Sequence, residues 1–97
     1  MRLLIVAATA LVALPAVAQD TASRNLAASC AICHGTEGRA VTKDVVPLAA
    51  LPKEQIVTQL KAFRDGTRPA TVMHQIAKGY NDAQIESLAG WFAVQKR

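Results

Sequence analysis

The five residues Cys30-Ala31-Ile32-Cys33-His34 constrain this chain more than any other stretch. Two thiols three positions apart, with a histidine directly after the second, form the attachment motif of a c-type haem. The spacing suits this chemistry, because each thiol adds across one vinyl group of the porphyrin and the histidine then lies beneath the ring. We therefore expect thioether bonds from Cys30 and Cys33, and an iron bond from His34 as the proximal ligand.

Other uses of the two cysteines remain open at this point. A thioredoxin-like redox site would place the pair at a strand-to-helix junction, but no strand pattern precedes Cys30. A structural zinc ion takes four ligands, and the only histidine beyond the motif is the distant His74. A simple disulfide is the third possibility. Haem attachment fits the spacing and the adjacent histidine better than any of these.

The first 18 residues have the pattern of a secretory signal peptide. Arg2 provides a positive start, Leu3 to Leu14 is an apolar run, and Pro15 precedes the small residues Ala16-Val17-Ala18. The run is too short to cross a bilayer core of about 30 Å. We expect cleavage after Ala18, which makes 1–18 a leader and 19–97 a single exported domain in the periplasm, with no membrane span. Such export agrees with the motif, since c-type haem is attached after export.

The composition of the exported part also favours a bound cofactor. A chain of about 80 residues rarely builds a sufficient core unaided, and a buried porphyrin would add apolar mass and crosslink the chain. The sequence has 11 basic and 7 acidic residues, and loss of Arg2 lowers the net charge from +4 to +3. Two haem propionates would bring this close to neutral. The basic residues are scattered without a series of stacking aromatic residues, so we expect no nucleic acid partner.

Helical periodicity predicts an all-α domain of about four helices and intervening loops. A first helix is expected over 21–31, a second from Pro52 to a stop at Gly66, and one or two further turns over 72–78. The segment 39–50 has no sustained period and is expected to form a loop around the haem.

The last helix has the clearest start signal. Asn81 is a favourable N-cap, Gln84 can complete a capping box, and Tyr80 with Ile85 can form a hydrophobic staple. The predicted buried positions of this helix are Ile85, Leu88, Ala89 and Phe92.

Met73 is the expected distal ligand of the iron, because it is the only methionine that remains after the leader is removed. A thioether opposite histidine raises the haem potential and suits electron transfer. His74 is the rival ligand and would lower the potential. Consecutive helical residues point about 100° apart, so both cannot face the iron. Lys78 competes less well because it must lose a proton, and a filler role for Met73 is the remaining alternative. We expect His74 on the surface.

These residues resemble a known family. The sequence is similar to that of a class I c-type cytochrome. The similarity lies in the haem motif followed by Gly35 and Gly38, in Met73, and in the stretches 76–80 and 88–92. Within that class, the sequence from Asn25 to Val94 resembles the small cytochrome subunit of flavocytochrome c sulfide dehydrogenase and its relatives.

The resemblance implies two features of the fold. The carbonyl of Pro47 would accept a hydrogen bond from Nδ1–H of His34, which orients a ligating imidazole, and the first and last helices would cross near Trp91 or Phe92. Two departures from the family pattern are visible. The glycine of the first-helix crossing is absent near Ser23 and Arg24, and the glycine after the Pro-x-Leu-Ala segment is replaced by Ala50.

The predicted function is one-electron transfer by a single covalent haem c, with no enzymatic activity in this chain. His34 is committed to iron, and no glycine fingerprint for flavin or nicotinamide is present. By resemblance, a flavoprotein sulfide dehydrogenase would oxidise the substrate and pass electrons to this subunit. One alternative is a freely diffusing periplasmic carrier that serves an oxidase or reaction centre. Another is a haem sensor or enzyme with an open sixth site, which requires Met73 to be away from the iron.

Overall fold

The computed structural model describes residues 8–10 and 15–97, with side chains from residue 21 onward in the second segment. Its helices are α1 (Pro15–Ala27), α2 (Ala31–His34), α3 (Lys53–Asp65), α4 (Met73–Ala77) and α5 (Asp82–Ala93), with 3₁₀ turns at Ala28–Cys30 and Thr36–Gly38. The described residues contain no strand, and the all-α prediction is confirmed. Among them, no helix combines the length and apolar character that crossing a membrane requires.

Most of the expected leader lies outside the described residues. Its described end, 15–18, forms the beginning of α1, and that helix continues across the expected cleavage point after Ala18. Pro15 occupies the first position of the helix, where a missing N–H is tolerated. Cleavage of the leader stays a prediction.

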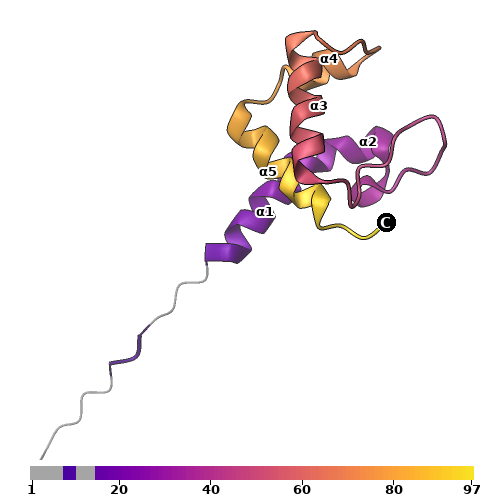
Figure 1. Cartoon of the computed structure of the whole chain (residues 1–97). Helices are drawn as coiled ribbons and strands as arrows, with labels where there is room; N and C mark the ends of the chain where they lie inside the picture. The colour runs from indigo at the N-terminus through magenta and orange to yellow at the C-terminus, as the bar shows by residue number, and fades with distance from the viewer. Residues whose placement is uncertain (1–7, 11–14) are drawn as a thin grey trace, which may run out of the picture.

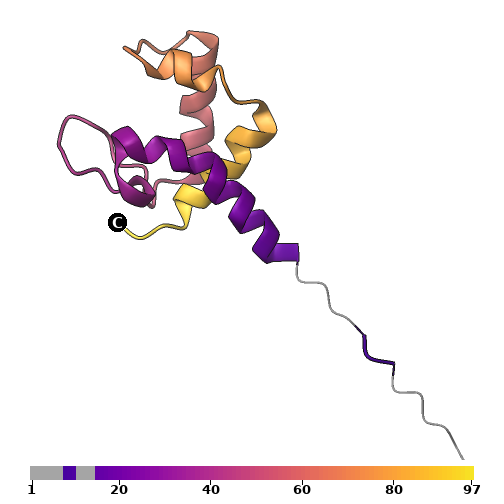
Figure 2. The same cartoon turned by 180° about the vertical axis from the view of Figure 1, so that it is seen from behind.

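Helices α1 and α5 cross and pack against each other (Figures 1 and 2). The Oγ atoms of Ser23 and Ser87 lie 2.6 Å apart and join the two helices by a hydrogen bond. Ala27 of α1 and Phe92 of α5 belong to the same buried cluster, with 2% and 1% of their surfaces exposed. Small residues at the crossing therefore replace the glycine that is missing from α1. Phe92 is the deeply buried member of the predicted aromatic pair, and Trp91 packs partly buried against the cluster.

Helix α3 also packs against α5 and contributes to the same buried cluster. Ile56 and Val57 are its buried residues, whereas Leu60 and Phe63 are half-buried. Pro52 is the N-cap rather than the first helical residue, and Gly66 ends the helix in the left-handed conformation, with φ of 78°. The Arg68 guanidinium lies 4.7 Å from the centroid of the Phe63 ring, a distance suited to a cation–π contact.

The segment between the second 3₁₀ turn and α3 is a loop, as predicted. Its end is fixed by backbone hydrogen bonds: the N–H groups of Leu48 and Ala49 donate to the carbonyl of Gly38 at 2.8 and 3.1 Å, and Ala50 donates to that of Phe92 at 3.0 Å. Ala50 has φ of 63°, in the left-handed region that favours glycine. The chain therefore keeps this backbone conformation without the glycine that favours it.

The start of α5 matches its prediction in detail. The Gln84 N–H donates to Oδ1 of Asn81 at 2.8 Å, and the Asn81 N–H donates to Oε1 of Gln84 at 3.0 Å, so both halves of the capping box are present. All four predicted core positions of α5 are buried: Ile85, Leu88, Ala89 and Phe92.

Candidate haem site

The two cysteines and the histidine of the motif lie where α1 passes through a 3₁₀ turn into α2. Cys30 is half-buried against the main hydrophobic cluster, and Cys33 is exposed. Burial raises the pKa of the Cys30 thiol. Both thiols are free, so the structure does not use them as a disulfide. The pair is thus presented from a short helical segment with one thiol facing the core.

The orientation of His34 is set by one hydrogen bond. Its Nδ1 lies 2.7 Å from the carbonyl oxygen of Val46. A carbonyl can only accept, so Nδ1 must carry the proton, and in the neutral ring Nε2 then has a free lone pair. This is the tautomer in which Nε2 can bind a metal, and such a bond also fixes the plane of the ring.

The acceptor of this bond is Val46, whereas the expectation was Pro47. The Pro-x-Leu-Ala pattern explains the shift: if Leu48 and Ala49 occupy its last two positions, then Pro47 stands at the variable position and Val46 at that of the proline. Pro47 still contributes, because a proline restricts the residue before it to extended conformations. Its physical role in the structure is therefore to limit the backbone that carries the acceptor.

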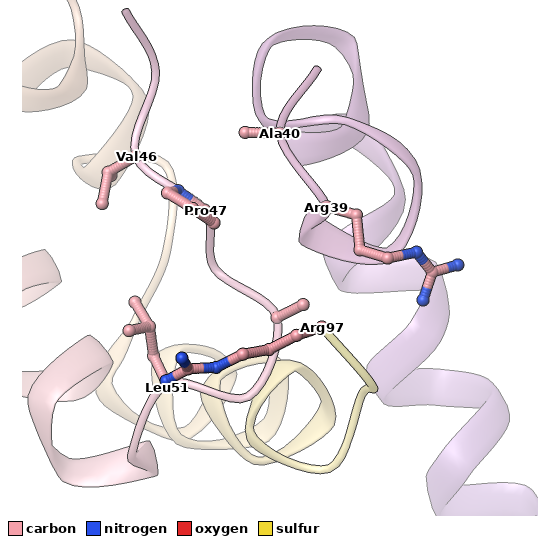
Figure 3. A pocket seen from close by; sticks show the side chains of 7 residues that line it. Arg39, Ala40, Val46, Pro47, Leu51 and Arg97 are labelled. Carbon is pink, nitrogen blue, oxygen red and sulfur yellow. The ribbon is translucent and has the colours of Figure 1, made fainter. Parts of the chain in front are cut away.

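Val46 and Pro47 also line a surface pocket of about 440 Å³. In Figure 3 they lie across this pocket from Arg39 and Ala40. Val46 is 56% exposed, so side-chain packing holds it weakly. The backbone bonds to Gly38 and the restriction imposed by Pro47 are the main features that place the carbonyl opposite His34.

Met73 is the first residue of α4 and is half-buried. Helix α4 packs against α3, and its fully buried Ala77 fixes the far end of this short helix. The methionine therefore stands on a different element from the cysteines and His34.

Tyr80 connects these two parts of the site. Its hydroxyl lies 3.1 Å from Oγ of Ser29, directly before Cys30, and donates to the carbonyl of Leu26 at 3.5 Å. Its own carbonyl accepts from Nη1 of Arg64 at 3.4 Å. Sequence reasoning identified Tyr80 only as part of a hydrophobic staple, because a hydrogen bond between residues 51 positions apart has no local signature.

His74 differs from its prediction as a surface residue. It is half-buried, and within the described part of the chain its Nδ1 is buried without a hydrogen-bond partner. An unpaired buried polar atom costs about 1–3 kcal/mol. His74 directly follows Met73 in the chain, and the missing hydrogen-bond partner of its Nδ1 requires an explanation.

The donor set fits a c-type haem. Two free thiols, a histidine in the tautomer that leaves Nε2 available and a methionine on a separate helix are the groups that such a haem requires. The described residues contain no group of three or more Cys, His, Asp or Glu side chains that could hold a metal ion. An all-α chain with this donor set defines the class of small c-type cytochromes.

Comparison with known proteins agrees with this class. The chain is 42% identical over 89 residues to the "Cytochrome subunit of sulfide dehydrogenase" of Chlorobaculum tepidum, covering 89% of this chain and 79% of that protein. It is 30% identical to "Cytochrome c-554(548)" of Halomonas halodenitrificans, over 70% of this chain and 86% of the relative. No family model matches.

A third relative is longer than this chain. The "Thiosulfate dehydrogenase electron acceptor" of Thiomonas intermedia is 39% identical over 72% of this chain, which spans 33% of that protein. The chain belongs to the family of c-type cytochromes that includes the cytochrome subunit of sulfide dehydrogenase. Its function is electron transfer, and it is not itself the catalytic enzyme.

Proposed function

We propose that this cytochrome carries one haem c bound by thioethers to Cys30 and Cys33, with His34 and Met73 as the axial ligands of its iron. The 2.7 Å hydrogen bond from His34 to Val46 is the observation that carries this proposal. It selects the imidazole tautomer needed for ligation and leaves Nε2 without the proton. When bound, the haem supplies one-electron redox chemistry.

The chain's own groups would then have separate roles. His34 holds its ring plane through Val46, and this bond also raises the basicity of the ligand. Met73 would hold the iron through a soft thioether, which would raise the potential and leave no site for a substrate. The protein would therefore exchange single electrons with its partners and perform no substrate chemistry of its own.

We further propose that the electron donor is a flavoprotein sulfide dehydrogenase and that this chain docks on it in the periplasm. Exposed apolar side chains support docking over free diffusion. Ile32, between the two cysteines, is 87% exposed, and Val72 and Ile76, which flank Met73, are 54% and 43% exposed. Apolar groups on the segments that present the haem ligands are the kind of surface that a partner protein covers.

An absorption spectrum of the oxidised holoprotein tests the ligation. We expect the weak red-edge band of methionine sulfur bound to ferric iron, and its loss in Met73→Ala. The matched control is Gln75→Ala, an exposed residue of the same helix, which should keep the band. A denaturing gel stained for haem should show colour that depends on Cys30 and Cys33. Rapid carbon monoxide binding by the reduced wild type would contradict the proposal and favour a sensor or enzyme.

Co-purification tests the partner. Native periplasm should yield the cytochrome with a flavin-containing chain, and Val72→Ser with Ile76→Ser should weaken that association while leaving the haem spectrum unchanged. A monodisperse cytochrome without flavin would favour the freely diffusing carrier. Mass analysis of the same sample should find Gln19 at the N-terminus, and retention of Met1 would contradict the leader prediction.

A further inference from the structure

His74 carries an imidazole that can bind a metal, and within the described residues no hydrogen bond fixes its buried Nδ1. Its ring is half-buried, and in the part of the chain that the structure describes its buried Nδ1 has no hydrogen-bond partner. A buried polar atom without a partner is uncommon in a native structure and calls for a physical explanation. An imidazole is also one of the common axial ligands of haem iron.

The helix start that carries Met73 and His74 is weakly fixed. Helix α4 spans only Met73–Ala77, and its N-cap Val72 makes no side-chain capping bond. Val72 contributes only its carbonyl, which accepts from Gln75 and Ile76 at 3.0 and 3.2 Å. The buried anchor of α4 is Ala77 at its other end. A rotation of the first turn is therefore less restrained than a movement of the whole helix.

We propose that His74 is a reserve axial ligand that replaces Met73 at the iron when the thioether is lost. This inference rests on the proposed function. Neighbouring helical side chains point about 100° apart, so a rotation of the first turn that removes Met73 brings the imidazole toward the same side. In the exchange one sulfur–iron bond breaks and one nitrogen–iron bond forms, with no change in the number of electrons.

The exchange would change the redox role of the protein without opening the sixth site. Methionine opposite histidine raises the haem potential, so the substitution of an imidazole lowers it. A cytochrome in this state would accept electrons less readily from its dehydrogenase. It would also remain closed to small ligands such as carbon monoxide.

Four holoproteins test the proposal: wild type, Met73→Ala, Met73→Ala with His74→Ala, and Met73→Ala with Gln75→Ala as the matched control. Absorption and electron paramagnetic resonance spectra report the spin state, and carbon monoxide binding reports an open site. We expect Met73→Ala and its Gln75 control to stay low-spin, with a lowered potential and slow carbon monoxide binding. The double variant without His74 should become high-spin and bind carbon monoxide rapidly.

Each other result has a definite meaning. If Met73→Ala is already high-spin and binds carbon monoxide as fast as the double variant, the reserve role of His74 is wrong. A further double variant, Met73→Ala with Lys78→Ala, tests the lysine: if this change rather than His74→Ala opens the site, Lys78 is the replacing ligand and the proposal is again wrong. A wild type without the methionine band refutes the proposed ligation itself. Met73→Leu, which retains side-chain volume, gives the same comparison if Met73→Ala does not accumulate.

Discussion

Ala50 gives a sharp test of how the loop next to the haem site is built. Its φ of 63° places an L-residue in the left-handed region, where an ordinary side chain costs about 1–2 kcal/mol. Glycine adopts this conformation without that penalty but loses about 0.4–1 kcal/mol through the greater freedom of the unfolded chain. We therefore expect Ala50→Gly to raise the free energy of unfolding by about 0.5–1 kcal/mol. For a domain of this size, the gain corresponds to about 2–8 °C in Tm.

The matched control is the neighbouring Ala49. It is 3% exposed and is absent from the residues with positive φ, so a glycine there gains nothing from the backbone. Ala49→Gly should instead lose about 1–2 kcal/mol, from backbone freedom and one buried methyl group.

Guanidinium unfolding of the holoproteins, followed by circular dichroism, measures both changes. The Ala50 N–H bond to Phe92 is a backbone bond and is kept in both variants. If Ala50→Gly destabilises the protein as much as Ala49→Gly does, the left-handed strain at Ala50 does not exist and the reasoning is refuted.

Three further predictions concern other parts of the site. Gly38→Ala should prevent accumulation of holoprotein, since a Cβ at φ of 80° would lie 2.9 Å or less from three atoms. Gly66→Ala has open space around it and should lower the free energy of unfolding by only about 1 kcal/mol. Expression yield and unfolding measurements distinguish the two variants. Tyr80→Phe removes both hydroxyl bonds and should cost about 1 kcal/mol, with the methionine band lost at lower temperature than in the wild type. The Arg64 guanidinium, 2.7 Å from Asp82, holds the pKa of that carboxyl below its usual value. The resulting stability is present above the usual pKa of Asp82 and is lost as pH falls through the lowered one. Arg64→Ala should therefore lose less stability on acidification, and parallel unfolding curves that shift equally with pH would contradict this.

Local sequence signals determined the features that were predicted successfully. Asn81 and Gln84 form the capping box because both partners lie within one helical turn. The stripe on α5 follows from the 3.6-residue period. Gly66 ends α3 because its left-handed φ suits a residue without a side chain.

The features that sequence could not reveal depend on distant partners. Val46 meets His34 across 12 positions, and only the folded loop shows which carbonyl faces the ring. The burial of Nδ1 of His74 depends on the packing of α4 against its surroundings. The only local signal was the position of this histidine beside Met73. Val57 is buried beside Ile56 because α3 contacts both α4 and α5. The buried face of α3 is therefore wider than a single apolar stripe.

The loop that carries Val46 has a consequence for how this protein can change. At Ala50 the loop is held by a hydrogen bond to the carbonyl of Phe92, in the core of α5. A few residues earlier, at Val46, it presents the carbonyl that orients the imidazole of His34. The packing of the last helix and the tuning of the proposed iron ligand thus share one short piece of backbone. A substitution in the core that displaces Phe92 should shift the reduction potential as well as the stability. Selection for either property alone would therefore alter the other, and the potential of this cytochrome is a property of its whole fold.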